Sequence, residues 1–132
     1  MLGKPYEGGH SEVIVSRKAP DTAIAAGFVC IESGVTIAKF AGSGTPAGVS
    51  GVTKQGSIAL VKAGLKVRAR TDLTSAVAGA AVYATSAGLV TTVSEGNTAL
   101  NATVSFADSK LTIVGEEADG TKYLMIDFVG GF

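Results

Sequence analysis

The sequence predicts an all-β domain, and three observations support this class. Short apolar runs recur roughly every ten residues along the chain, a spacing typical of β-sandwiches and barrels. Glycine contributes 18 of the 132 residues, scattered without a fixed period between these runs, as expected of many turns. No long window keeps the helical period of about 3.6 residues. The length suits one domain that buries its own core.

The clearest predicted strand covers Ser57–Arg70, and the neighbouring segments are expected to pair around it. Side chains of a strand point alternately to opposite faces. From Lys62 onward, one face would therefore be basic and the other apolar. The basic parity holds Lys62, Gly64, Lys66, Arg68 and Arg70, and the apolar parity holds Ala63, Leu65, Val67 and Ala69. At Val61-Lys62 the alternation is interrupted, which predicts a β-bulge.

Residues 1–22 are expected to form an extended N-terminal arm, followed by a β domain over residues 23–132. Glycine, proline and charged residues are frequent in the arm, and its one apolar island is Val13-Ile14-Val15. An extended segment of this kind often adds a strand to the edge of a sheet. The sequence leaves open whether that edge belongs to the chain's own sheet or to a neighbour.

The remaining elements follow from apolar runs bounded by turn residues. A hairpin is expected over residues 27–40, with its turn at Ser33-Gly34, and a glycine-rich loop over 41–48. Further strands are expected over 49–53, 79–84, 89–92, 98–106, 111–114 and 123–128, with an Asp119-Gly120 turn before the last. Segment 72–77 starts with a good N-cap residue and allows one helical turn. The total is about nine short strands.

Charge and hydropathy exclude several classes of function. The formal net charge is zero, which argues against a nucleic-acid binder that relies on a strongly basic field. No aromatic side chains are interleaved with the basic residues of 62–70, as binding of single strands would require. The start of the chain lacks the apolar stretch of a signal peptide, and no run is long enough for a membrane helix. We therefore expect no nucleic-acid partner and no membrane association.

The charges are nevertheless unevenly distributed along the chain. Basic residues gather in the middle, and acidic residues dominate the last third. Complementary zones of this kind allow head-to-tail association or docking to a partner. The alternative interpretation is that both zones are solvated faces.

The sequence also predicts that the chain is not an enzyme and binds no cofactor or metal. A catalytic site needs a nucleophile, a base and an orienting group, or a metal ion. The single histidine, His10, lies in the arm, and Glu116 and Glu117 are adjacent, so they would face opposite sides of a strand. The segment Ala41–Thr45 lacks the Gly-Lys-Ser/Thr ending of a phosphate-binding loop. Cys30, the only cysteine, sits in an apolar run and is expected to pack in the core.

The stretch Ala78–Val90 reads AGAAVYATSAGLV, and it follows a hairpin, a Gly/Pro loop, a Gly-Val strand and the long polar-faced strand. This motif and this order of segments resemble the small phage head-decoration proteins, also called structural cement proteins. The resemblance extends over Ala25–Phe128, and it leaves out the arm.

The resemblance implies a β-barrel-like or β-tulip domain that binds the outer surface of an icosahedral phage capsid. Such proteins cement neighbouring major capsid proteins after expansion, usually as homotrimers and sometimes as dimers. The chain would be made in the host cytoplasm and located in the virion. The residues expected to contact the capsid or a sister subunit are Val13, Ile14, Val15 and Arg17 of the arm and Lys62, Lys66, Arg68 and Arg70 of the basic strand.

Two other functions remain open from the sequence. A phage tail or baseplate β-module would share this composition. A carbohydrate-binding module would need aromatic side chains exposed on a sheet face, for which Tyr6, Tyr83 and Tyr123 are the candidates.

Overall fold

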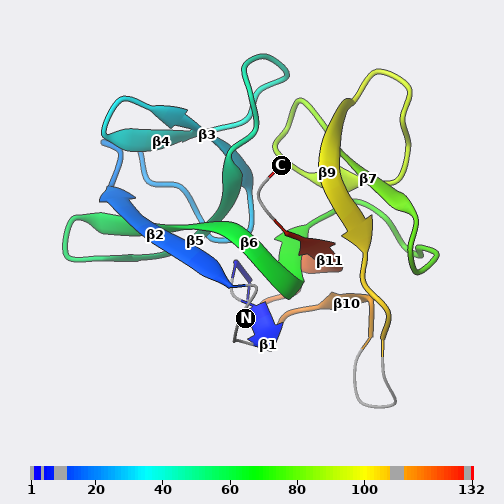
Figure 1. Cartoon of the computed structure of the whole chain (residues 1–132). Coiled ribbons are helices and arrows are strands. Elements are labelled where there is room, and N and C mark those ends of the chain that lie inside the picture. The colour runs from blue at the N-terminus through cyan, green and yellow to red at the C-terminus, as the bar shows by residue number, and fades with distance from the viewer. Residues whose placement is uncertain (1, 4, 8–11, 108–111, 130–131) are drawn as a thin grey trace.

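The computed structural model describes residues 2–3, 5–7, 12–107, 112–129 and 132, and these residues form strands and no helix (Figure 1). The predicted all-β class is therefore confirmed. The strands are β1 (Pro5–Glu7), β2 (Val13–Lys18), β3 (Val29–Ser33), β4 (Thr36–Lys39), β5 (Gly48–Lys54), β6 (Ser57–Arg70), β7 (Ala81–Ala84), β8 (Val90–Thr91), β9 (Thr98–Val104), β10 (Val114–Glu116) and β11 (Lys122–Phe128).

These strands join in one sheet, in which the paired strands are antiparallel. The order is β4-β3-β5-β6-β11-β9-β7-β8, while β1 and β2 also pair with β6, and β10 pairs with β11. The path ends at β4 on one side and at β8 on the other. In the described part of the chain the sheet is therefore not closed into a barrel.

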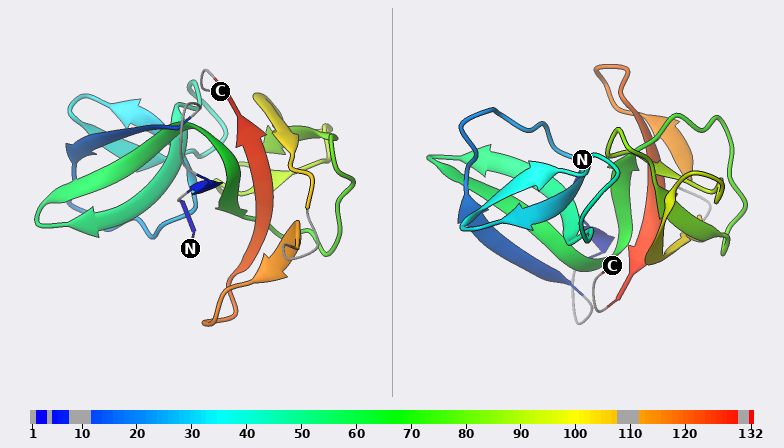
Figure 2. Two further views of the ribbon diagram at one scale, coloured as in Figure 1. Left: turned by 60° about the horizontal axis from the view of Figure 1, so that its bottom comes forward. Right: turned by 90° about the horizontal axis from the view of Figure 1, so that it is seen from above.

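Strand β6 holds the sheet together, as expected for Ser57–Arg70. Its first half pairs with β2 and β5, and its second half pairs with β1 and β11. The sheet thus divides into a first lobe, made of β2–β5 and residues 57–63, and a second lobe, made of residues 64–70, β1 and β7–β11 (Figure 1). Two further views show β6 and β11 side by side between the lobes (Figure 2).

Two hydrophobic cores follow from this division. The first lobe encloses a small core of Cys30, Ile37, Ile58 and Leu60. The main core joins Val29, Phe40, Val49 and Val61 of the first lobe to Val67, Val82, Val104, Leu124, Ile126 and Phe128 of the second. Full burial of one such side chain contributes about 1.5–3 kcal/mol. Because the main core contains side chains of both lobes, it holds the two lobes together.

The β-bulge predicted at Val61-Lys62 is confirmed where β6 pairs with β2. Val13 lies opposite Ala63, whereas the next residue, Ile14, lies opposite Val61. One extra residue of β6 is therefore inserted at Lys62. The adjacent residues Leu60 and Val61 point to opposite faces of β6, and both are fully buried, each in a different core.

A second irregularity, which the alternation pattern did not predict, lies at Lys66. Its φ angle is 54°, a left-handed conformation that costs a side-chain-bearing residue roughly 1–2 kcal/mol. Ile126 lies opposite Val67 and Phe128 opposite Gly64, so β6 again holds one more residue than its partner. The parity predicted for Gly64 is therefore wrong, because this residue is buried.

The side chain of Asp127 stabilises this second irregularity. Its Oδ1 atom accepts a hydrogen bond of 2.7 Å from the Lys66 amide and one of 2.6 Å from the Ser105 hydroxyl. The carboxylate therefore satisfies a backbone donor of β6 that the bulge takes out of the ladder. It also ties β6 to the end of β9.

The N-terminal segment pairs along β6 instead of projecting from the domain as a separate arm. β2 lies beside the first half of β6, and β1, which the sequence did not predict, lies beside the second half. Leu2 is 8% exposed and packs against Tyr123 and Met125. Of the two partners left open for Val13–Val15, the structure shows the chain's own sheet.

The hairpins of the predicted domain are largely confirmed, with two differences. The hairpin over residues 27–40 is β3–β4, and the Asp119-Gly120 turn joins β10 to β11. The strand expected over 111–114 begins only at Val114, and its residue 111 lies outside the described residues. The segment 72–77 forms a loop without a helical turn.

We predict that Asp127→Ala lowers the free energy of unfolding by about 2 kcal/mol, because it leaves the Lys66 amide and the Ser105 hydroxyl without their acceptor. Chemical denaturation of the purified protein measures this loss. Asp21→Ala is the control, since Asp21 is exposed. Equal loss in both variants would mean that the carboxylate of Asp127 does not support the bulge.

Candidate interaction surface

Strand β2 carries four of the residues expected to make contacts, and its two faces differ. Val15 packs against the core of the first lobe. Val13 and Ile14 are exposed over 46% and 41% of their surface. Arg17 lies on the same parity as Val15 and reaches across to β3. Only Val13 and Ile14 therefore present a large apolar surface to solvent.

Arg17 and Lys62 are brought together around one carboxylate. Arg17 bonds to Glu32 Oε1 through both Nε, at 2.9 Å, and Nη2, at 2.7 Å. The Lys62 ammonium lies 3.4 Å from Glu32 Oε2. The hydrogen bond from Arg17, followed by the positive charge of Lys62, lowers the pKa of the Glu32 carboxyl below its ordinary 4.5. This cluster links β2, β3 and β6 across the first lobe.

The basic residues of the second half of β6 also have partners within the chain. Arg68 lies 3.3 Å from Glu117 and stacks over the ring of Tyr123, with 4.4 Å between the guanidinium carbon and the ring centroid. Arg70 donates to the Ala26 carbonyl at 2.8 Å and stacks over Phe28. These guanidinium groups therefore fasten neighbouring segments to β6.

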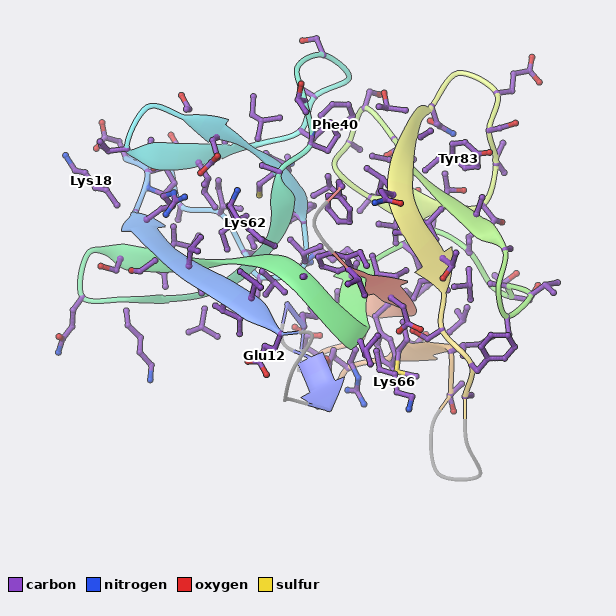
Figure 3. The ribbon with its side chains drawn as sticks, viewed as in Figure 1. Glu12, Lys18, Phe40, Lys62, Lys66 and Tyr83 are labelled. Atoms are coloured by element: carbon purple, nitrogen blue, oxygen red, sulfur yellow. The ribbon has the colours of Figure 1, made fainter. Side chains whose placement is uncertain are left out.

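The four basic residues of β6 do not form one continuous basic face. Lys62 points toward β3 and β4, whereas Lys66 points away from them, at the other end of the strand (Figure 3). The bulge at Lys66 rotates the strand between these positions. The basic parity predicted for this strand is thus split over different surfaces.

A hollow in the described part of the first lobe lies beside β4. It has a volume of about 480 Å³ and is lined by residues 20–25, by Phe28 and by β4. Ile24, Phe28 and Ile37 give it apolar walls, and the Lys39 ammonium rests over the Phe28 ring at 4.6 Å. Asp21 and Lys39 are the charged residues of its lining.

The other candidates for a reactive site are a metal-binding cluster, His10 and Cys30. Within the described residues there is no group of three or more His, Cys, Asp or Glu that could hold a metal ion. His10 lies outside the described residues. Burial raises the pKa of the Cys30 thiol from 9.0 to about 11, and its Sγ donates to the Phe28 carbonyl. The predicted core position of Cys30 is confirmed.

The tyrosines do not form an exposed aromatic platform in the part of the chain described. Tyr123 is buried, and Arg68 covers its ring. Tyr83 is half-buried on β7 (Figure 3). The side chain of Tyr6 lies outside the described residues. The most exposed large aromatic side chain is instead Phe106, which is 69% exposed beside Gly79.

Comparison with known proteins places the chain in no group. No protein-family model, curated protein or solved structure matches it. The described residues also contain no helix that could cross a membrane.

We predict that Glu32→Gln lowers stability at neutral pH. Because the pKa of Glu32 is depressed in the folded state, its ion pairs stabilise the fold above the ordinary 4.5, and this contribution is lost as the pH falls through the folded pKa. The difference from wild type in chemical denaturation should shrink with acid and with salt. Glu95→Gln, at an exposed loop position, is the control. A difference that does not change with pH would contradict this role.

A second prediction concerns Cys30. Its thiol should resist a water-soluble disulfide reagent at mildly alkaline pH in the folded protein and react at once in denaturant, because it is 0% exposed and its pKa is raised. Absorbance of the released thiolate measures both rates. Rapid reaction of the native protein would contradict the buried position.

Proposed function

We propose that this chain is a structural protein of a phage virion that binds the outer surface of the icosahedral capsid and cements neighbouring major capsid proteins after expansion. The proposed partner is the major capsid protein, and the proposed assembly is a homotrimer, with a dimer as the alternative. The proposal rests on the segment that resembles the decoration proteins and on the structural role of its residues.

The observation that carries the proposal is that the motif residues of Ala78–Val90 are those that build the β7–β8 hairpin. Val82 and Val90 are fully buried in the main core. The Thr85 hydroxyl accepts hydrogen bonds from the amides of Ala87 and Leu89, at 3.2 and 3.3 Å, and so organises the turn. The residues on which the resemblance rests thus build this part of the fold.

Gly88, the second glycine of the motif, lets this turn touch the first lobe. Its φ angle is 75°, and a Cβ atom there would lie 2.7 Å from Cγ of Lys39. Its carbonyl accepts a 2.9 Å hydrogen bond from the Val29 amide. The motif therefore also contacts the first lobe.

The physical character of the domain supports a binding role. Several large apolar side chains, among them Val13, Val52 and Phe106, are exposed. A protein that binds only the expanded shell stabilises that shell by mass action. Many copies on one lattice turn modest contacts into strong overall attachment.

We predict that the purified chain co-sediments with expanded phage heads from a host in which its gene resides, and binds unexpanded heads at least about tenfold more weakly. Heads stripped of decoration proteins provide the free sites, and light scattering of the free protein gives its oligomeric state. A deletion of residues 1–20 is unsuitable as a test, because it would remove two partners of β6. Failure to bind expanded heads would overturn the proposal.

A further inference from the structure

A row of side chains crosses the outward face of the first lobe at the turn between β5 and β6. Lys18 of β2 lies opposite Ser57 of β6, and Lys54 of β5 lies opposite the same serine from the other side. Side chains directly opposite one another in a sheet point to the same face. The two ammonium groups therefore flank Ser57 on one surface, where all three residues are exposed.

The same face is apolar further along the strands. Ser16 lies opposite Ala59, and Ile14 precedes Ser16 by two residues, so both share the face of Ser57. On the other side of β6, Val52 is 47% exposed. Ile14, Val52 and Ala59, together with Lys54, line a shallow hollow of about 280 Å³. We call this surface, from Ile14 and Val52 to Lys18 and Lys54, the docking face.

An apolar surface of this kind is unusual on the solvated side of an antiparallel sheet, where polar side chains are the rule. Its floor is made of small residues. A Cβ atom added to Gly51 would lie 2.9 Å from the Cβ atom of Ala59, which shows how closely β5 and β6 are packed there.

The charges on the docking face indicate what kind of partner would fit it. In the first lobe Arg17 and Lys62 share the carboxylate of Glu32, so both cations already have an ion-pair partner within the chain. Lys18 and Lys54 have no ion pair with the acidic residues that the structure describes. A partner with carboxylates at one end of an apolar ridge would complement both parts of the docking face.

We propose that the docking face is the surface with which this protein contacts the capsid, and that its partner is an acidic, apolar-ridged surface of the major capsid protein. This inference rests on the proposed function and assigns its contact to residues other than Arg68 and Arg70. Those arginines hold segments of the chain itself, so their guanidinium groups are already occupied.

The test compares two double variants with the same change of net charge. Lys18→Gln with Lys54→Gln removes two positive charges from the docking face, and Thr74→Glu with Ser75→Glu adds two negative charges to an exposed loop of the second lobe. Binding of each to expanded heads is measured by co-sedimentation over a series of salt concentrations. The lysine variant should bind about tenfold more weakly, with a shallower salt dependence, and the loop variant should bind as the wild type does.

A second pair tests the apolar part of the docking face. Val52→Asp should weaken binding by more than about tenfold, because it would bury an unpaired carboxylate, whereas Val93→Asp, at a similarly exposed position, should not. Thermal unfolding confirms that each variant is folded.

The outcomes separate this inference from the proposed function. If the wild type binds expanded heads and the docking-face variants bind equally well, the inference fails and the function stands. If the wild type does not bind, both fail. If the docking-face variants keep full binding to heads but lose self-association in light scattering, the face joins copies of this chain, and its assignment to the capsid is overturned.

Discussion

The arrangement of the two lobes depends on β6, because this one strand forms part of both lobes. β6 pairs with four other strands along its 14 residues, and no straight strand could meet all of them. The bulges at Lys62 and Lys66 turn it between the lobes, and the second turn has an energetic cost because Lys66 adopts a left-handed conformation. The carboxylate of Asp127, which bonds to the Lys66 amide, offsets this cost from the neighbouring strand. The lobe arrangement is thus controlled by two short segments.

Next to the bulge at Lys62, β6 contributes hydrophobic side chains to both cores. In a regular strand, Leu60 and Val61 would face opposite sides, and only one would be expected to be buried. Here Leu60 fills the core of the first lobe and Val61 fills the core between the lobes. Both sides of β6 are therefore covered by protein near the bulge, whereas toward the β5–β6 turn the outward side is left open at Ala59 and Ser57. This outward side of the first lobe is exposed because the second lobe does not extend over it.

Local patterns in the sequence predicted most of the strands, although not β1, and they did not predict the site. The hairpins at 27–40 and 79–92, the long strand and the bulge at Val61-Lys62 each depend on residues that are neighbours in the sequence. The bulge at Lys66 depends on Asp127, which lies 61 positions away. Glu32 lies 15 positions from Arg17 and 30 from Lys62, so the sequence did not show that their charges are paired. The row of Lys18, Ser57 and Lys54 could have been found only from the register of three strands.

Because the arginines of β6 already have partners within the chain, they are poorly suited to bind another molecule. The basic strand looked suited to an acidic partner, yet Arg68 and Arg70 hold Glu117 and the Ala26 carbonyl, and releasing them would leave those groups without partners. One edge of β2 is likewise used by β6, so its main chain is not free on that side to add to a neighbouring sheet. The proposed contact therefore uses side chains on an exposed face. Such contacts depend on the shape and charge of both surfaces, which makes them more selective than strand addition.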